Sequence, residues 1–390
     1  MSFNGLVHRL VLAVAPWYLR TFEGVKKVTI DQPQRLTKLI DQATKDNRRL
    51  IIAFRHAAKE DAPVLMHAFN SLGTHPAFLY GSDVPQWAGK KAEWIFPRLG
   101  AIAVQNLGAN SSSMQSMRRT LAQGKFPLAL APEAQVTYHM YRTKEITGGV
   151  ASLALWATEQ DLVPTILPVV VGYRHSSDQI ALINSLLQQL QQKCSFSLTG
   201  SSLSEQLLEA TAALITLLSS TYDVPSNPEL SLEQNIHILC EVLLAKGEEL
   251  FDYSLEGSLL TRLFTLRYKI LKEGEKGSSD TTAASIYQQI VDSLMYVDPS
   301  YITPPCSNGR GCEYALHLLD LFNRMQGGNI NSRYSPKNKE ALVVSGEPIV
   351  VGPRTQSRKN EAAGLTKIVE GGLEAVSKHL ESIWEHTQMH

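Results

Sequence analysis

The sequence predicts an α/β fold in which a mostly parallel mixed sheet is flanked by helices and carries a large all-helical insertion. Between residues 25 and 173, short apolar runs alternate with segments of helical periodicity, the pattern of strands joined by helical crossovers. Residues 178–330 show helical periodicity and polar breaks but no convincing strand, and strand-like sequence returns at 341–351. We therefore expect an α/β core made of residues 23–176 plus 336–390, with a helical insertion at 177–335.

The first 22 residues are expected to form an amphipathic helix that precedes the core. Apolar residues recur at helical spacing at Phe3, Leu6, Val7, Leu10, Val11, Val14, Trp17 and Tyr18. His8-Arg9 and Pro16 interrupt the run, so it is too short to span a bilayer, and no small-residue cleavage site follows it. A helix lying in the membrane interface is expected, and a helix packed on its own protein is the alternative.

Each expected strand is a short apolar run bounded by Gly, Pro or polar residues. The strands of the core are expected at 25–30, 50–54, 77–81, 100–104, 126–130, 166–173 and 341–351. Apolar residues at intervals of three and four predict core helices at 34–43, 61–72, 87–96, 112–123, 149–160 and 365–384. The same spacing predicts helices of the insertion at 180–192, 203–219, 232–245, 259–272, 283–295 and 314–325.

The composition excludes several classes of function. Lys plus Arg and Asp plus Glu each number 37, so no basic field favours a nucleic acid partner. The cysteines form no C-x-x-C pair and have no matching His cluster; they are Cys194, Cys240, Cys306 and Cys312. We expect reduced thiols in a cytoplasmic protein, and no zinc or other bound metal.

The strand-to-helix turn at 54–61 carries the strongest candidate for chemistry. His56 follows the apolar run 50–54, and Asp61 precedes Ala62-Pro63 and a further apolar run, as at the start of a helix. This spacing places the carboxylate within reach of one imidazole nitrogen, which leaves the other nitrogen to accept a proton from a hydroxyl. The alternative is structural: Asp61 is then only a helix N-cap and His56 only a polar turn residue.

Glu133 is a second candidate at the end of a strand. It follows the apolar run 126–130, and the polar residues Tyr138, His139, Arg142 and Lys144 come after it. An unpaired buried charge is costly, so a carboxylate at this position favours a functional role. A loop glutamate that caps the next helix is the alternative.

Five blocks, in this order and spacing over residues 45–175, resemble the glycerolipid acyltransferase family, which includes the lysophosphatidate acyltransferases. They are His56-x4-Asp61, Gly-Ala-Ile-Ala-Val at 100–104, Ala-Pro-Glu at 131–133, Gly-Val-Ala-Ser-Leu-Ala-Leu at 149–155 and Ile-Leu-Pro-Val-Val-Val at 166–171. Gly346-Glu347-Pro348-Ile349 is similar to the strand that closes the family's core. The resemblance implies the acyltransferase αβ sandwich, with about 160 residues of helical sequence inserted before that last strand.

The resemblance also implies a reaction. His56 would be the general base for an acceptor hydroxyl, Asp61 would orient it, and Glu133 would help to bind the acceptor. The acyl group would come from a thioester of coenzyme A or acyl carrier protein, a co-substrate, and no other cofactor is implied. The expected enzyme is an O-acyltransferase similar to 1-acylglycerol-3-phosphate acyltransferases, peripheral to the cytoplasmic face of a membrane.

The sequence departs from the family where the acceptor's phosphate is held. The family's Arg after the third strand falls on Asn106, the Gly after Glu133 is Ala134, and Thr147 and Gly148 replace basic residues. Other arginines are candidates to hold an acceptor in place of the missing one: Arg55, Arg98, Arg118, Arg119 and Arg142. Two readings therefore stand beside a lysophospholipid-like acceptor. One is the same chemistry on a lipid acceptor without glycerophosphate, and the other is a non-catalytic lipid-binding scaffold of the same fold.

Overall fold

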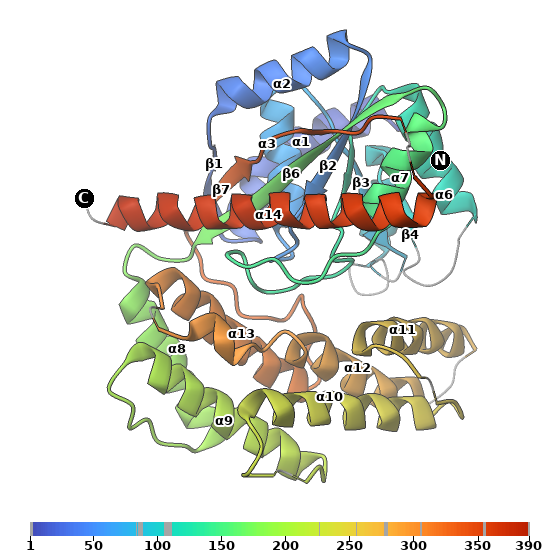
Figure 1. The fold of residues 1–390 in the computed structure, drawn as a ribbon. Coiled ribbons are helices and arrows are strands. Elements are labelled where there is room, and N and C mark those ends of the chain that lie inside the picture. The colour runs from blue at the N-terminus through green and yellow to red at the C-terminus, as the bar shows by residue number, and fades with distance from the viewer. Residues whose placement is uncertain are drawn as a thin grey trace. The chain divides into compact units, whose positions relative to one another are not determined.

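The computed structural model divides the chain into two compact units (Figure 1). One consists of residues 1–175 and 336–390, and the other of residues 176–335. The structure describes residues 3–82, 84, 89–104, 111–225, 227–254, 256–276, 280–304, 306–353 and 356–388. The first unit contains all the described strands, and the second contains helices α8 to α13.

The sheet of the first unit has the order β1-β7-β6-β2-β5-β3-β4, with β8 paired to the free stretch of β6. Its strands are β1 Val25–Ile30, β2 Arg48–Phe54, β3 Ala77–Gly81, β4 Ile102–Val104, β5 Leu128–Leu130, β6 Val163–Arg174, β7 Lys339–Ser345 and β8 Ile349–Val350. All described pairings are parallel except those of β6 with β7 and with β8. The expected mostly parallel, mixed α/β sheet is confirmed.

The strand expected at 341–351 joins this sheet but is broken in two. Ser345 of β7 pairs with Val169, and Ile349 of β8 pairs with Ile166, so three residues lie opposite two on β6. Pro348 lacks a backbone N–H, and so does Pro168 on the facing strand, so the ladder cannot continue through this point. The expectation of one continuous strand was wrong, because proline chemistry splits it.

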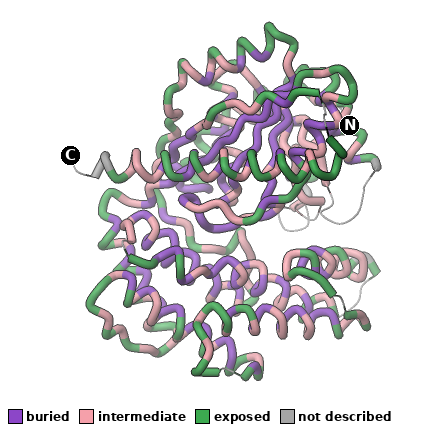
Figure 2. The backbone as a smooth tube through the Cα atoms, viewed as in Figure 1, coloured by how far each residue is buried: buried purple, intermediate pink, exposed green. Residues whose placement is uncertain are grey.

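Helices cover both faces of the sheet. Helices α6 Ser111–Gln123, α7 Gly149–Thr158 and α14 Arg358–Gln388 share one apolar cluster with inward-facing residues of β2, β5 and β6. Helix α3, Asp61–Ser71, lies against β1, β6 and β7, and α1, Gly5–Thr21, packs on α3. Helix α2, Pro33–Lys45, contacts β2, and α5, Lys90–Ile95, precedes a single 3-10 turn, Phe96–Leu99. The central strands are buried along almost their whole length (Figure 2).

Helix α1 is buried on one side and exposed on the other. Asn4 caps its first turn, and the helix continues through Pro16. His8 faces inward, with its ring centroid 3.9 Å from that of His75, while Phe3 packs on both rings. Burial lowers the pKa of His8 and lowers that of His75 to about 4, so both packed rings are neutral near pH 7. The opposite side exposes a row of apolar side chains: Leu6, Leu10, Val14 and Trp17.

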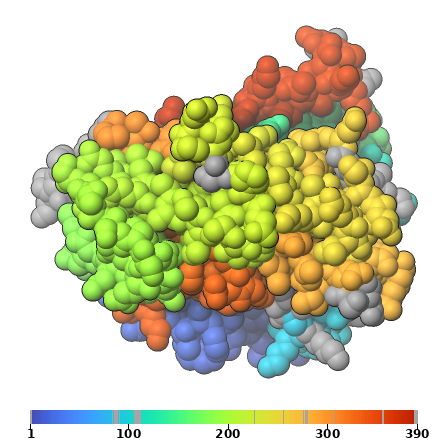
Figure 3. Space-filling model, turned by 90° about the horizontal axis from the view of Figure 1, so that it is seen from below, coloured from blue at the N-terminus to red at the C-terminus, as the bar shows by residue number. Residues whose placement is uncertain are grey.

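The second unit is built from six helices among its described residues. They are α8 Gln179–Cys194, α9 Leu203–Thr221, α10 Leu232–Glu249, α11 Leu259–Glu275, α12 Asp280–Leu294 and α13 Asn308–Met325. Serine capping boxes begin α9 and α10, which explains why both helices start where the sequence changes from polar to apolar. Helices α8 to α11 form much of the surface of this unit that Figure 3 displays.

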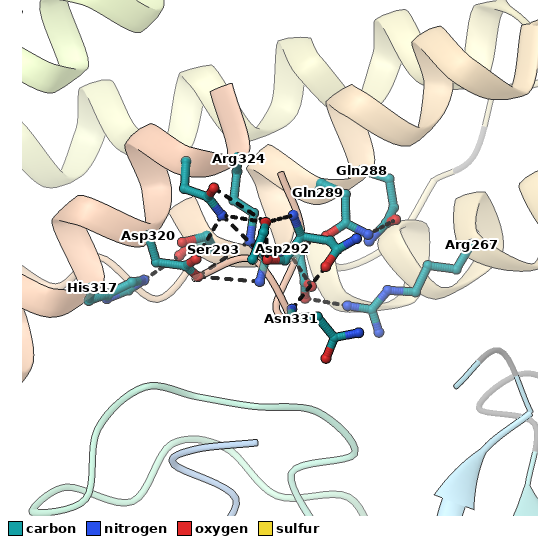
Figure 4. A network of polar contacts seen from close by, with 12 residues as sticks. Arg267, Gln288, Gln289, Asp292, Ser293, His317, Asp320, Arg324 and Asn331 are labelled. Atoms are coloured by element: carbon teal, nitrogen blue, oxygen red, sulfur yellow. Dashed lines mark hydrogen bonds and ion pairs between the residues drawn. The ribbon is translucent and has the colours of Figure 1, made fainter. Parts of the chain in front are cut away.

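A buried polar network joins three helices of this unit (Figure 4). The guanidinium of Arg324 on α13 is fully buried, lies 3.3 Å from Asp320 and forms an ion pair with Asp292 of α12. Asp292 also pairs with Arg267 of α11. Because each buried charge has an opposite charge beside it, the network fixes how α11, α12 and α13 pack without leaving an isolated ion in the interior.

Two adjacent glycines of α14 provide a test of how closely that helix approaches the sheet. A Cβ at Gly372 would lie 2.9 Å from Cγ of Pro168, a rigid ring, whereas a Cβ at Gly371 would meet nothing within 4 Å. Gly371→Ala should stabilise the fold by about 1 kcal/mol through helix propensity. Gly372→Ala receives the same gain but adds overpacking, so its free energy of unfolding should lie about 1–3 kcal/mol below that of Gly371→Ala. Urea denaturation of both variants measures this difference, and equal stabilities would contradict the close approach.

Candidate active site

The candidate site lies at the carboxyl end of β2. Arg55 continues the strand, with its N–H donating to the carbonyl of Val169 at 3.0 Å. The chain then turns through His56 and two small buried residues, Ala57 and Ala58, and α3 begins at Asp61. Five residues thus suffice to bring the histidine and the carboxylate to the same end of the sheet, where α/β folds commonly place their sites.

His56 and Asp61 are in contact. Nδ1 of His56 lies 3.1 Å from Oδ2 of Asp61. The carboxylate is fully buried, whereas the imidazole side chain is 24% exposed. An ionised carboxylate only accepts hydrogen bonds, so Nδ1 carries the proton and Nε2 offers its lone pair. The pair can therefore accept a proton from a hydroxyl at Nε2.

Asp61 is not the N-cap of α3, which was the structural role that the sequence offered as an alternative. The N-cap is Glu60, whose side chain makes no capping bond. The Asp61 carboxylate turns back over the loop, where Oδ2 accepts from the N–H of Ala58 at 2.8 Å. The N–H of Asp61 in turn donates to the carbonyl of Ala58 at 3.1 Å. These two bonds close the turn and fix the carboxylate beside the ring.

A third donor reaches Asp61 from β6. The hydroxyl of Tyr173 donates to Oδ1 of Asp61 at 2.7 Å, and the tyrosine is buried. Burial and the nearby carboxylate of Asp61 raise the pKa of Tyr173 well above its usual value, so the phenol stays a neutral donor. Sequence reasoning missed this residue. The available signal was its position at the carboxyl end of a strand parallel to β2.

The acidic residues around this turn are paired with lysines. Glu60 is fully buried, and its Oε1 lies 2.5 Å from Nζ of Lys339 on β7. Glu23, which follows α1, lies 3.2 Å from Nζ of Lys59 and accepts from the hydroxyl of Tyr18 at 2.7 Å. Since the neighbouring carboxylates have their own cations, the His56 ring has Asp61 as its direct acidic partner.

Arg55 and Glu133 form a buried ion pair that is bonded to the backbone of His56. Oε1 of Glu133 accepts from Nε of Arg55 at 2.7 Å, and Oε2 accepts from the backbone N–H of His56 at 2.8 Å. Both side chains are fully buried. The remaining Arg55 nitrogens donate to Ser377 and Thr137, each at 3.2 Å, and to the carbonyl of His139. Glu133 therefore holds the backbone of the turn rather than capping a helix.

Of the residues expected to bind an acceptor, the structure brings Arg55 and Glu133 together. Arg55 and Glu133 are buried and bonded to each other, so either side chain could contact a ligand only if the pair opened. Acceptor binding by these two residues stays a prediction, and this arrangement does not favour it. Arg142 is partly buried in the loop that follows Glu133. Asn106 lies outside the described residues. Of the other arginines, Arg98 lies over the ring of Trp94 and Arg118 over that of Trp156.

The part of the chain that the structure describes contains no metal site, no membrane-spanning helix and no disulfide. Within it, no three His, Cys, Asp or Glu side chains are arranged to hold a metal ion. None of the described helices is both long and apolar enough to cross a membrane. The four cysteines, all in described segments, form no disulfide.

A comparison with protein-family models finds a match. Residues 27–172 fit the model of a protein family described as Acyltransferase. That match supports an acyltransferase activity. It covers His56, Asp61 and Glu133, and it agrees with the resemblance to glycerolipid acyltransferases. A search of curated proteins finds no match to this chain. The matched segment ends before Tyr173, Lys339 and Ser377, which complete the buried surroundings of the turn.

The Arg55–Glu133 pair predicts a large stability difference between two glutamate substitutions. Glu133→Gln leaves the Arg55 charge buried without a counter-charge and turns an amide N–H₂ toward a donor, which should cost about 3–5 kcal/mol. Glu347→Gln is the matched control, because Glu347 pairs with Arg35 but its side chain is 89% exposed. That substitution should cost about 0–1 kcal/mol. Chemical denaturation measures both, and similar small losses would show that Glu133 does not hold the turn.

Proposed function

We propose that this protein transfers a fatty acyl group from a thioester to the hydroxyl of a lipid acceptor, with His56 as general base. The thioester would be that of coenzyme A or acyl carrier protein. The observation that carries the proposal is the dyad: a partly exposed imidazole bonded through Nδ1 to a fully buried carboxylate. The acyltransferase match over residues 27–172 supports the reaction class.

The proposed reaction needs only the dyad and the two substrates. Nε2 of His56 takes the proton of the acceptor hydroxyl as the hydroxyl oxygen bonds to the thioester carbonyl carbon. Asp61 stabilises the imidazolium through its bond to Nδ1–H. The carbon–sulfur bond then breaks, and the leaving thiolate takes the proton back from Nε2. An ester and a free thiol result, the dyad is regenerated, and no acyl-enzyme forms.

Removal of the base should abolish most of the activity. His56→Ala should reduce transfer about 10²- to 10⁴-fold, the usual contribution of general base catalysis. Asp61→Asn should be nearly as harmful, because the amide neither supports the imidazolium nor fixes the same tautomer. Thioester turnover by the purified proteins measures both, with circular dichroism to verify folding. Near-normal transfer by folded His56→Ala would contradict the mechanism. A wild-type protein that binds lipid but transfers no acyl group would favour the scaffold reading.

The acceptor is proposed to carry a masked phosphate or none. A phosphate monoester is best held by the planar, bidentate fork of an arginine. The family's arginine position is Asn106 in this chain, which supplies no charge. Arg55 is an unfavourable substitute, because its guanidinium is fully buried and its nitrogens bond Glu133, Thr137, His139 and Ser377.

A competition assay tests this choice of acceptor. Loss of one charge-assisted bond costs about 1.5–3 kcal/mol, or roughly 10- to 200-fold in affinity. Lysophosphatidate should therefore lose to lysophospholipids or neutral lipid alcohols when all are offered with one acyl thioester. If lysophosphatidate is the preferred acceptor by a wide margin and Arg142→Ala removes that preference, the phosphate site has moved. A preference for lysophosphatidate that Arg142→Ala leaves unchanged would also contradict the proposal.

The exposed side of α1 is proposed to place the protein on a lipid surface. Leu6, Leu10, Val14 and Trp17 are 69%, 61%, 52% and 60% exposed and follow one another at helical spacing. The exposed basic residues on or just after this helix are Arg9, Arg20, Lys26 and Lys27, and α1 itself contains no acidic residue. An apolar row beside cations suits the interface of a membrane that contains anionic lipid.

Vesicle binding tests this surface. Leu10→Ser combined with Trp17→Ser removes two large apolar side chains and should weaken binding to anionic vesicles about 10-fold or more. Ile368→Ser on α14 is the matched control, because Ile368 is 56% exposed but lies outside the row. It should bind as the wild type does. Co-sedimentation with vesicles with and without anionic lipid measures all three proteins. Equal binding by the double variant and the control would exclude α1 as the contact.

A further inference from the structure

We propose that Tyr173 is a positioning residue for the dyad, which holds the Asp61 carboxylate and moderates the charge that His56 experiences. The inference rests on the proposed function and adds a residue to it. Tyr173 lies outside the segment that matches the acyltransferase model, which ends at residue 172.

The three donors to Asp61 divide between its two oxygens. Oδ2 receives the N–H of Ala58 and faces Nδ1 of His56, whereas Oδ1 receives the Tyr173 hydroxyl at 2.7 Å. Without the tyrosine, Oδ1 would be a buried charged oxygen with one donor fewer. The carboxylate plane would also lose the contact that fixes its rotation, since both remaining bonds lie on the other oxygen. Tyr173 thereby controls the direction in which Oδ2 meets the imidazole.

The Tyr173 hydroxyl also affects how strongly the Asp61 carboxylate stabilises a proton on the His56 ring. A donor that binds the carboxylate disperses part of its negative charge, so the imidazolium beside it is stabilised less. The other charged groups near the turn are already paired: Glu60 with Lys339, Glu23 with Lys59, and Glu133 with Arg55.

Two further groups border Tyr173 itself. The Lys339 ammonium lies 5.6 Å from the centre of the phenol ring. The His175 ring is stacked with the Tyr173 ring, with 6.3 Å between the two ring centres. The Tyr173 hydroxyl itself bonds Asp61, so its loss alters the field at His56 through Asp61.

Tyr173→Phe removes the hydroxyl and keeps the ring. We expect kcat for acyl transfer to fall about 10-fold with little change in KM for the thioester, because the substrates still bind but the base is less well oriented. The acid limb of the pH–rate profile should move to higher pH by about half a unit to one unit, since the less solvated carboxylate retains the proton on the ring more strongly. A role confined to packing would lower activity without moving that limb.

Replacement of Tyr173 with 3-fluorotyrosine reverses the direction of the shift. The fluorinated phenol is a stronger donor, so it should withdraw more charge from Asp61 and move the acid limb to lower pH. Tyr314→Phe is the matched control. Tyr314 is equally buried, and its hydroxyl bonds Thr211 in the helical unit, so its loss removes a buried phenol hydroxyl without touching the dyad. It should leave the pH profile unchanged.

A reaction that needs no acyl transfer separates this proposal from the proposed function. Diethyl pyrocarbonate reacts with the unprotonated form of histidine and not with imidazolium, and peptide mass analysis reports the rate at His56 as a function of pH. The profile should move upward for Tyr173→Phe and downward for the fluorinated protein, even if the wild type proves inactive as an acyltransferase. If both profiles coincide with the wild type, or if Tyr314→Phe shifts as far as Tyr173→Phe, Tyr173 does not position the dyad.

Discussion

The structure around the candidate site depends on one constraint, a carboxylate with no exposed surface. A buried ionised carboxyl group is costly unless donors surround it. Asp61 meets that requirement with three neighbours from three places: the N–H of Ala58 in its own turn, the ring of His56 and the hydroxyl of Tyr173 on β6. The turn, the strand order and the burial of α3 all serve to bring these groups together. The same dry surroundings strengthen the bond that would support an imidazolium at His56.

The surroundings of this turn come from parts of the chain that are far apart in sequence. Lys339 and Ser377 reach the turn from beyond the helical unit, and they bond Glu60 and Arg55. The chain leaves the first unit after residue 175, re-enters it at residue 336 and joins the same sheet as β7, between β1 and β6. The segment that matches the acyltransferase family model is therefore not sufficient to bury this site, since the C-terminal stretch supplies partners for two of its charges.

Local features were predictable from the sequence, and long-range partners were not. The spacing of His56 and Asp61 on a strand-to-helix turn fixes their approach within a few residues, and the structure shows the contact at 3.1 Å. The partners of Glu133 could not be predicted, because an acidic residue at the end of a strand gives the same sequence pattern whether it faces a ligand or a buried arginine. The break between β7 and β8 could be read only once Pro168 and Pro348 were known to face the same ladder. Helix α1 illustrates both cases: its periodicity predicted an amphipathic helix, but only the structure shows which side packs on the protein.

The central claim is that His56, oriented by Asp61, accepts the proton of the acceptor hydroxyl. Chemical rescue tests it most directly, because an added base can replace the missing ring without any other change in the protein. In His56→Gly, free imidazole should restore acyl transfer, and the restored rate should follow the concentration of unprotonated imidazole as pH is varied. Asp61→Asn should show no such recovery, since its own imidazole still occupies the site. Transfer by His56→Gly at the wild-type rate without imidazole, or a rescue that ignores the protonation state of the added base, would contradict the account.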